Sequence, residues 1–427
     1  MAASRFEPAG PLRGALRPPP DKSVSHRAAL IAAMAEGETR IEGYLDSADT
    51  SSTLAAVEAL GAEVARSGPD VRVRGVGLRG AGEAAIDVGN AGTLLRLLPG
   101  WLAGQETGAW TLDGDDSIRR RPVDRIAEPL RAMGASLSCR EERLPPLRIE
   151  AAPLRGISYE LPVASAQVKS CLLLAGLLAD GETEVVEPLP SRDHTERMLT
   201  AAGAEVRRGD GTVSVRPAAR LEPGSIAVPA DFSSAAFFLV AALLVPGSEV
   251  ALEEVGLNPT RTGLLAILER MGAGIEIEER GERGGEPSGR IRARSSSLRG
   301  TEVGGADVPL AIDELPLVAL TACFAEGETT IRDAGELRRK ESDRIATVSE
   351  ALRALGAEVE TSEDGMRISG RGSLRGGAVD AHGDHRIAML GAIAGLASRE
   401  GVEVAGVEAA AVSYPGFERD LASLANR

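Results

Sequence analysis

The chain is poor in several residue types, and each shortage excludes a class of function. Only three of its 48 basic residues are lysine, aromatic residues make up 3% of the 427 residues, and cysteine occurs three times. Few aromatic rings and a net charge of -15 argue against nucleic-acid binding, because bases stack on aromatic rings and phosphates attract positive charge. The three cysteines lie far apart and give no metal-ligand spacing.

Long apolar runs are also missing. The longest, around Ala235 to Val245, is well short of the roughly 18 residues that a membrane span needs. The opening MAASRFEPAG lacks the apolar core of a signal peptide. We therefore expect a cytoplasmic protein in a reducing compartment, long enough for more than one hydrophobic core.

Six stretches share one design, in which a short polar cluster leads into an apolar helix and then a glycine. A helix start offers backbone N–H groups without intrahelical partners and the positive end of the helix dipole, so it suits an anion. The six stretches begin at Asp21, Gly89, Ser165, Asp231, Asp313 and Asp384.

A longer repeat surrounds these helices. Each apolar helix is followed by a strand, a second, more polar helix that ends in Gly-Ala, and two further strands. The glycines recur about every 70 to 80 residues, which predicts a βαβαββ unit with the sixth copy cut off by the C-terminus. The Gly-Ala pairs are Gly61-Ala62, Gly134-Ala135, Gly203-Ala204, Gly272-Ala273 and Gly356-Ala357.

The incomplete last copy predicts that a strand near residues 14–17 completes it from the other end of the chain. The rigid run Pro18-Pro19-Pro20 then marks a crossing between two domains, and Val228-Pro229-Ala230 marks the return. We expect three repeats in each domain and the active site in the interdomain cleft. The predicted domains are residues 21–229 and residues 1–20 plus 230–427.

Two polar clusters at predicted helix starts are candidate anion sites. Lys22, Ser23 and Arg27 combine an ammonium, a hydroxyl and a guanidinium, which suits a phosphate or a carboxylate, although basic residues near a helix start often face solvent. The loop GNAGT from Gly89 allows a ligand to approach the backbone closely, or forms a tight packing turn.

The run RRKESDR is the densest charged cluster. On a helix, Lys340 and Arg344 would share one face with Glu341 beside them, and an ordinary salt-bridged surface is the alternative. Asp313 precedes an apolar helix, where a carboxylate either caps the helix or acts as a base. Asp384 presents the same two possibilities.

Lysine occurs only at positions 22, 169 and 340, each within a polar motif. An ammonium is compact and titratable, and a guanidinium does not replace it. Either these positions require an ammonium, or a coding bias has left three lysines by chance.

Eight motifs together resemble the 5-enolpyruvylshikimate-3-phosphate (EPSP) synthase family: DKSVSHR, GNAGT, RRRP, SAQVKS, SRDHTERM, RKESDR, GDHRIAM and SYPGF. SAQVKS and SRDHTERM are similar to its class II bacterial branch. The resemblance implies a two-domain inside-out α/β barrel with six βαβαββ repeats, three per domain. It also implies transfer of the enolpyruvyl group of phosphoenolpyruvate to the 5-hydroxyl of shikimate 3-phosphate, with release of phosphate through a tetrahedral intermediate.

The same resemblance implies no metal and no organic cofactor. We expect a monomer whose partners are its two small-molecule substrates, with neither nucleic acid nor a membrane among them.

Roles for individual residues follow from the resemblance. Asp313 would take the proton from the attacking hydroxyl, and Glu341, with Lys22 near it, would protonate the methylene carbon of phosphoenolpyruvate. The implied contacts of shikimate 3-phosphate are Lys22, Ser23, Arg27, Ser165, Gln167, Ser191, Asp313 and Lys340. Those of phosphoenolpyruvate are Lys22, Gly92, Arg121, Gln167, Arg192, Arg344 and Arg386.

Two positions depart from the family pattern. Val412 stands where many relatives carry a lysine, and Glu336 stands where some have asparagine. Gly92 follows the pattern of members that bind the herbicide glyphosate, since alanine at this position excludes it. We therefore expect glyphosate to inhibit the enzyme.

Two other functions compete with this one. UDP-N-acetylglucosamine enolpyruvyl transferases share the fold, but have Lys-Asn where this chain has Lys22-Ser23 and a cysteine where it has Asp116. A repeat module that binds an anionic metabolite or a protein without catalysis is the second alternative. The presence of both Asp313 and Glu341 favours an enzyme.

Overall fold

The computed structural model describes residues 3–425 and divides into two compact units. Unit 1 comprises Met1–Pro19, Ala230–Gly281 and Pro287–Arg427, and unit 2 comprises Pro20–Pro229 and Glu282–Glu286. Each unit has a hydrophobic core of its own. Within the described range, no helix combines the length and the apolar character needed to cross a bilayer.

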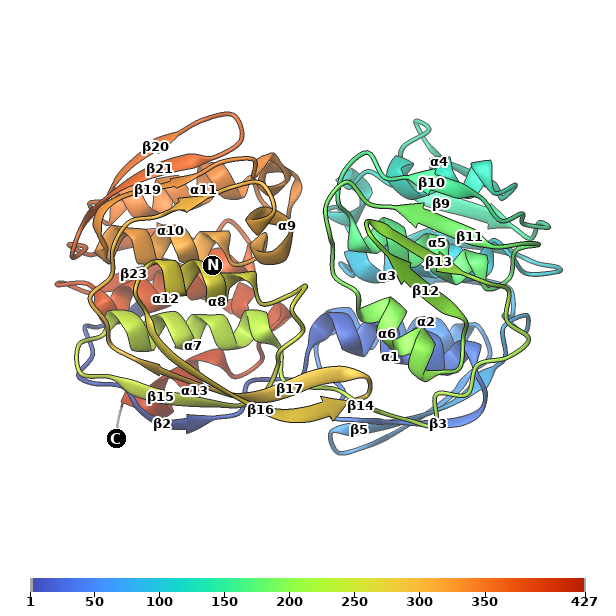
Figure 1. Cartoon of the computed structure of the whole chain (residues 1–427), viewed down its shortest axis with the longest axis horizontal. Helices are drawn as coiled ribbons and strands as arrows, with labels where there is room; N and C mark the ends of the chain where they lie inside the picture. Colours follow the sequence, from blue (N-terminus) through green and yellow to red (C-terminus); the bar gives the residue numbers. More distant parts are fainter. Residues whose placement is uncertain (1–2, 426–427) are drawn as a thin grey trace. The chain divides into compact units, whose positions relative to one another are not determined.

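Unit 2 contains three four-stranded sheets and the helices packed on them (Figure 1). Its elements are α1 (Lys22–Met34), β3 (Glu36–Glu42), α2 (Ala48–Ala59), β4 (Glu63–Ser67), β5 (Asp70–Val76), β6 (Ala84–Asp87), α3 (Gly92–Leu102), β7 (Ala109–Asp113), η1 (Ile118–Arg120), α4 (Asp124–Ala132), β8 (Ser136–Arg140), β9 (Leu144–Glu150), β10 (Ser158–Glu160), α5 (Ala166–Gly176), β11 (Thr183–Val186), α6 (His194–Ala201), β12 (Val206–Gly209), β13 (Thr212–Val215) and β14 (Ser225–Ala227). The strand orders are β14-β3-β5-β4, β6-β7-β9-β8 and β10-β11-β13-β12. In each sheet the first pair is parallel and the other two are antiparallel.

Unit 1 also contains three small mixed sheets, two of four strands and one of three. Its elements are β1 (Ala3–Phe6), β2 (Arg13–Leu16), α7 (Phe232–Leu244), β15 (Glu249–Gly256), α8 (Gly263–Arg270), β16 (Gly274–Arg283), β17 (Glu286–Arg294), β18 (Glu302–Val303), α9 (Asp307–Ala311), α10 (Leu315–Phe324), β19 (Glu326–Ile331), η2 (Gly335–Arg339), α11 (Arg344–Ala354), β20 (Glu358–Thr361), β21 (Met366–Arg371), β22 (Gly377–Asp380), α12 (His385–Ala397), β23 (Val402–Ala405), η3 (Val407–Val412) and α13 (Phe417–Ala425). The strand orders are β16-β17-β15-β2, β18-β19-β21-β20 and β1-β23-β22.

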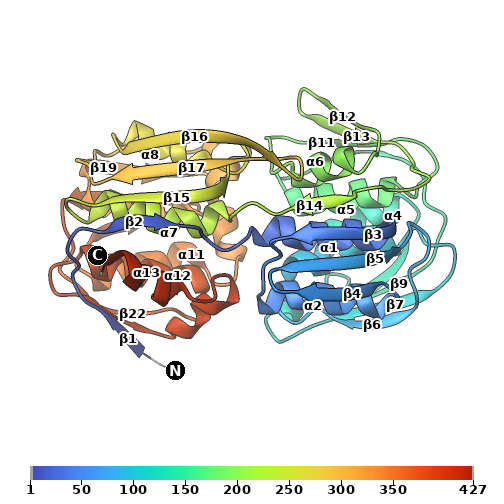
Figure 2. The ribbon, with the colours of Figure 1, turned by 90° about the horizontal axis from the view of Figure 1, so that it is seen from below.

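The N-terminal strands differ from the prediction. The expectation that residues 14–17 complete the last repeat is wrong, because β2 pairs in parallel with β15, in the sheet that follows α7. Figure 2 shows β2 beside β15. The last sheet is completed by β1, which pairs antiparallel with β23. The β1 strand is four residues long and reads ASRF, so its sequence carries little strand signal, and pairing with a distant strand decides its place.

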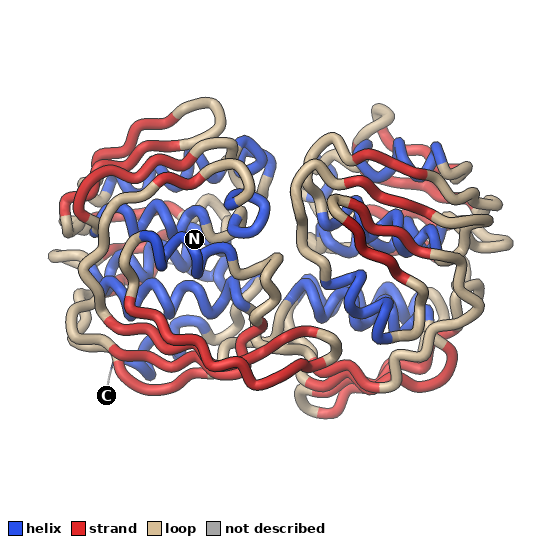
Figure 3. The backbone as a smooth tube through the Cα atoms, in the orientation of Figure 1, coloured by secondary structure: helices blue, strands red, loops and turns tan. Residues whose placement is uncertain are grey.

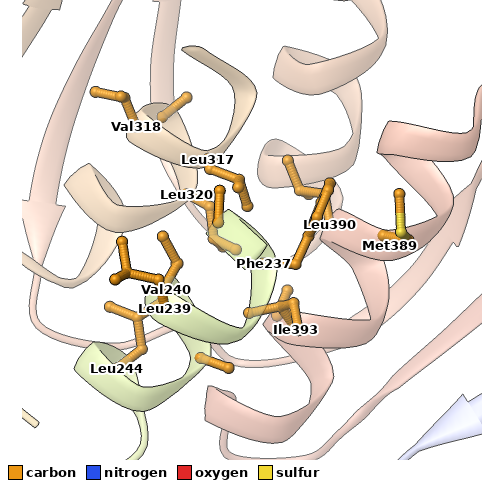
Figure 4. Packing of buried hydrophobic residues seen from close by; sticks show 14 of the residues in the cluster. Phe237, Leu239, Val240, Leu244, Leu317, Val318, Leu320, Met389, Leu390 and Ile393 are labelled. Atoms are coloured by element: carbon orange, nitrogen blue, oxygen red, sulfur yellow. The ribbon is translucent and has the colours of Figure 1, made fainter. Parts of the chain in front are cut away.

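The six predicted apolar helices are confirmed as α1, α3, α5, α7, α10 and α12. Every residue of α7 is buried, as expected of a helix that is apolar on all sides. Figure 3 shows helices grouped inside the strands of each unit. In unit 1, α7, α10 and α12 pack together, and the side chains of Phe237, Leu320 and Leu390 point toward one another (Figure 4).

The glycine of each Gly-Ala pair ends the second helix of its repeat. All five glycines have φ between 88° and 103°, a conformation that side chains with a Cβ rarely adopt. The N–H of the next residue then donates back into the helix, as Ala62 N does to the Val57 carbonyl oxygen at 3.0 Å. This ending turns the chain sharply from the helix into the next strand.

The close approach of α3 and α5 yields a stability prediction. A Cβ on Gly100 would lie 2.1 Å from the carbonyl oxygen of Cys171, so Gly100→Ala must push the two helices apart. We expect the free energy of unfolding in denaturant to fall by about 1–3 kcal/mol. Gly10→Ala is the control, because no described atom lies within 4 Å of its Cβ, and its stability should stay within about 0.5 kcal/mol of wild type. Equal stabilities for the two variants would contradict this packing argument.

Candidate active site

Asp313 lies in unit 1 within reach of three cationic side chains. Its Oδ1 is 3.3 Å from Lys340 Nζ and 3.5 Å from Arg344 Nη1, and its Oδ2 is 3.9 Å from Arg386 Nη2. Glu314, and not Asp313, occupies the N-cap position of α10. The choice between a helix cap and another role is therefore resolved, since the Asp313 carboxylate faces the cations.

Arg344, the first residue of α11, is buried among carboxylates. Its Nε donates to Asp384 Oδ2 at 2.8 Å, and its Nη2 donates to Glu341 Oε2 at 2.7 Å. Burial works against the charge, but Glu341 and Asp384 outweigh it and raise the pKa of the Arg344 guanidinium above its ordinary value. Asp384 also accepts from the backbone N–H of Arg386 at 2.9 Å, so it caps α12 while it holds Arg344.

The side chain of Arg386 is held by Asp313 and by Ser233, which the sequence did not single out. Its Nη1 donates to the main-chain oxygen of Asp313 at 2.9 Å, and its Nη2 donates to Ser233 Oγ at 3.0 Å. The buried carboxylate of Glu314 accepts from Ser233 Oγ at 2.5 Å and from Arg261 Nη1 at 2.8 Å. Arg261 thus compensates the charge of a carboxylate that has no access to solvent.

The run RRKESDR is not one helix. The η2 turn ends before Lys340, whose backbone is extended, and α11 begins only at Arg344. The prediction that these two residues share a helix face is therefore wrong. Asp343 accepts from the backbone N–H of Ala346 at 3.1 Å, and this cap sets the helix start. Lys340 and Arg344 nevertheless both reach Asp313.

In unit 2, α1 positions Lys22 and Arg27. Lys22 Nζ donates to Asp49 Oδ2 at 2.9 Å and keeps 21% of its side chain exposed. Arg27 is buried and donates to Thr195 Oγ1 at 2.8 Å and to the carbonyl oxygen of Ser23 at 3.0 Å. Burial lowers the pKa of Arg27 to about 10, which leaves the guanidinium charged at neutral pH.

The starts of α3 and α5 lie close together. A Cβ on Gly92 would lie 2.8 Å from Arg121 Nη1 and 3.2 Å from Arg96 Nη1, so the absence of a side chain leaves room for both guanidinium groups. Gln167 Oε1 accepts from Arg96 Nη1 at 3.2 Å, and its Nε2 donates to Thr93 Oγ1 at 3.3 Å. These contacts place Gly92, the side-chain amide of Gln167 and the guanidinium groups of Arg96 and Arg121 side by side.

Ser191 and Arg192 lie in the loop between β11 and α6. The Ser191 hydroxyl donates to Glu187 Oε1, and Glu187 Oε2 accepts from Lys169 Nζ at 2.8 Å. Arg192 is partly buried in the same loop. Ser165 is the N-cap of α5, and its side chain accepts from a backbone N–H in the first turn of that helix.

The predicted site residues of unit 1 form one connected cluster. Those of unit 2 lie at the starts of α1, α3 and α5, in the loop before α6 or, for Arg121, directly after η1. The sequence missed their hydrogen-bonding neighbours, because most of these lie far from them in the chain. The missed residues are Asp49, Arg96, Glu187, Ser233 and Glu314, together with Arg261, which pairs with Glu314.

Known proteins match the chain over nearly its whole length. The family model EPSP synthase (3-phosphoshikimate 1-carboxyvinyltransferase) matches residues 6–421. A 3-phosphoshikimate 1-carboxyvinyltransferase of Thermus thermophilus is 53% identical over 426 residues, which cover 99% of each chain. The chain belongs to the EPSP synthase family. It catalyses enolpyruvyl transfer from phosphoenolpyruvate to shikimate 3-phosphate, in the shikimate pathway of aromatic amino acid biosynthesis.

Other EPSP synthases support the same assignment. An enzyme of Desulfitobacterium hafniense is 50% identical over 416 residues, covering 97% of this chain and 95% of its own. A solved EPSP synthase from Acinetobacter baumannii has a TM-score of 0.89 at 42% identity and covers 100% of this chain and 98% of that one. The function predicted from the eight motifs is therefore confirmed. The two alternatives, a UDP-N-acetylglucosamine enolpyruvyl transferase and a binding module without catalysis, are not supported.

The enolpyruvyl transferase NikO from Streptomyces tendae shares the fold more distantly. Its structure has a TM-score of 0.79 at 18% identity and covers 98% of this chain and 96% of its own. At this identity the likeness concerns the fold alone. The predicted α/β class is confirmed as six small mixed sheets that match EPSP synthase and enolpyruvyl transferase structures.

His26, beside the cationic residues of α1, yields a prediction about pH. Its Nδ1 lies 2.6 Å from Thr53 Oγ1, and burial lowers its pKa from 6.5 to about 3. The unfolded chain takes up a proton below pH 6.5 and the folded chain does not, so this residue costs stability as the pH falls. Its contribution between pH 7 and pH 5 should be about 2 kcal/mol.

The variant His26→Gln measures this contribution directly. The difference in free energy of unfolding between wild type and variant should change by that amount between pH 7 and pH 5, in the direction of a relatively weaker wild type at pH 5. A difference that stays constant across this range would mean that the folded protein protonates His26.

Proposed function

We propose that Asp313 is the general base of the enolpyruvyl transfer. Its side chain is 14% exposed, and Lys340, Arg344 and Arg386 border the carboxylate. In this arrangement a base stands among cations that suit two anionic substrates. Asp313 takes the proton of the 5-hydroxyl of shikimate 3-phosphate as that oxygen bonds to the central carbon of phosphoenolpyruvate.

We assign protonation of the methylene carbon of phosphoenolpyruvate to Glu341 together with Lys22. Glu341 keeps 29% of its side chain exposed while Arg344 donates to it at 2.7 Å. The addition yields a tetrahedral intermediate, which then loses phosphate and one proton of the new methyl group to restore the double bond. Cationic side chains stabilise the charge that develops on the leaving phosphate.

Binding of the two substrates is divided between two sets of residues in this proposal. Two observations support these sets: their residues match the family motifs, and most of the residues lie at helix starts. Shikimate 3-phosphate contacts Lys22, Ser23, Arg27, Ser165, Gln167, Ser191, Asp313 and Lys340. Phosphoenolpyruvate contacts Lys22, Gly92, Arg121, Gln167, Arg192, Arg344 and Arg386.

We further propose that the chain is a class II member, folded as a two-domain inside-out α/β barrel with three βαβαββ repeats per domain. The motifs SAQVKS and SRDHTERM support the class, and the three sheets of each unit support the repeats. The domains proposed are residues 21–229 and residues 1–20 plus 230–427. We also propose a cytoplasmic protein, which free cysteines support, and a monomer, which the family resemblance implies. Sedimentation velocity tests the oligomeric state.

Asp313→Asn tests the assignment of the base. The variant keeps the size of the side chain, so shikimate 3-phosphate should still bind, while kcat falls about 100-fold or more. Phosphate release with both substrates measures turnover, and calorimetry measures binding. Asp307→Asn in α9 is the matched control, because this carboxylate pairs with Arg270 outside the site, and its kcat should equal that of wild type. Full turnover in Asp313→Asn would show that Asp313 is not the general base.

Gly92→Ala tests whether the start of α3 must lack a side chain for phosphoenolpyruvate and glyphosate to bind well. The new methyl group must displace the guanidinium of Arg121, so the KM for phosphoenolpyruvate should rise about tenfold and glyphosate should inhibit more weakly still. The KM for shikimate 3-phosphate should change by less than about twofold. Steady-state kinetics with each substrate and the herbicide check this, with Gly10→Ala as control. Equal glyphosate sensitivity of wild type and Gly92→Ala would refute it.

A further inference from the structure

Lys169 is the most buried of the three lysines. Its side chain is 1% exposed, against 21% for Lys22 and 29% for Lys340. On α5, its Nζ lies 2.8 Å from Glu187 Oε2 and 2.7 Å from Glu196 Oε1. The ammonium thus pairs with two carboxylates inside unit 2.

The same ammonium also holds the loop that follows β11. Its Nζ donates to the main-chain oxygen of Ser191 at 3.3 Å. The Ser191 hydroxyl donates to Glu187 Oε1, the second oxygen of the carboxylate that Lys169 binds. Lys169 therefore controls both the backbone and, through Glu187, the hydroxyl of Ser191.

A single ammonium does not balance two buried carboxylates. The side chains of Glu187 and Glu196 are 7% and 0% exposed. The second cation is the buried Arg27, whose charge Glu196 stabilises electrostatically. Asp21 and Glu286 act on Arg27 in the same sense as Glu196, and Arg192 acts in the opposite one, so removing Lys169 alone takes one positive charge from a region that holds several buried carboxylates. An unbalanced buried charge is strongly unfavourable.

The hydrogen bond of Ser191 bears on ligand binding. A hydroxyl has one proton, so Ser191 cannot donate to Glu187 and to a phosphate oxygen at once. To bind phosphate, it must turn away from Glu187, and that carboxylate must keep another donor. The ammonium of Lys169 has three protons and is that donor.

We propose that Lys169 is a positioning residue for shikimate 3-phosphate. It neutralises Glu187, so that the Ser191 hydroxyl can turn to the phosphate group without leaving an uncompensated carboxylate beside an anion. The inference rests on the proposed contact between Ser191 and shikimate 3-phosphate. A lysine suits this position in an arginine-rich chain, since its compact ammonium meets three oxygen atoms at once.

Lys169→Met tests the proposal, because it removes the ammonium and keeps a long unbranched side chain. Glu187 then stands uncompensated near the bound phosphate, so the KM for shikimate 3-phosphate should rise about 10- to 100-fold. The KM for phosphoenolpyruvate and kcat should each change by less than about threefold, since Lys169 contacts neither the proposed base nor the proposed acid. An unchanged KM for shikimate 3-phosphate overturns the proposal.

The double variant Lys169→Met with Glu187→Gln provides a rescue test. It removes one charge of each sign and so keeps the net charge of this buried region as it is in wild type, and the KM for shikimate 3-phosphate should return to within about threefold of wild type. If Lys169 only stabilised the fold, the double variant should be more impaired than Lys169→Met, because a second interaction would be lost. A double variant as impaired as Lys169→Met, or more so, overturns the proposal. If Lys169→Met does not fold, the charge-balanced double variant still has to show this near-normal KM.

Two further variants separate this inference from the proposed function. Ser191→Ala should raise the KM for shikimate 3-phosphate about tenfold. An unchanged KM would overturn both the proposed contact of Ser191 with this substrate and the inference about Lys169. An effect of Ser191→Ala without an effect of Lys169→Met would overturn the inference alone. Val185→Ala, at a buried position of β11, lowers stability without touching the charged groups, and should leave both KM values unchanged.

Discussion

The ion pair between Arg344 and Asp384 is the interaction on which the site of unit 1 depends. The two side chains are 1% and 0% exposed, and breaking such a buried pair by removing one partner costs about 3–5 kcal/mol. Asp384 also caps α12 and so places Arg386 at the first turn of that helix. Arg344 in turn reaches Glu341 and Asp313. One buried carboxylate thus sets the positions of two cations and, through them, of the proposed acid and base.

Unit 2 applies the same constraint with different residues. Lys169 is buried against Glu187 and Glu196, and the buried Arg27 interacts electrostatically with Glu196. Lys22, in contrast, stays partly exposed although it pairs with Asp49. Buried charges of opposite sign hold the structure, and Lys22, which is proposed to contact both substrates, keeps part of its side chain at the surface. A net charge of -15 is therefore compatible with an anion-binding enzyme, because the local arrangement of charges decides binding.

Much of the fold could be predicted because its signals are local. An apolar helix such as α7 and a Gly-Ala ending such as Gly61-Ala62 depend on residues within a few positions. The failures concern competition between local and distant partners. The cap at Asp343 prevents a continuous helix through Lys340, and β1 pairs with β23 at the opposite end of the chain. Neither outcome follows from propensity.

The sequence by itself determined the six buried helices, the glycine endings and, through its eight motifs, the family and the reaction. It also named Lys340, Arg344 and Arg386, because those residues belong to recognisable motifs, and Asp313, because a carboxylate there precedes an apolar helix. Only the tertiary structure decided which side chains contact each basic residue of the site. Arg344 and Asp384 are 40 residues apart, and Arg386 and Ser233 are 153 apart. Such pairs are chosen by packing and by the cost of burying an uncompensated charge, and neither leaves a mark in the local sequence.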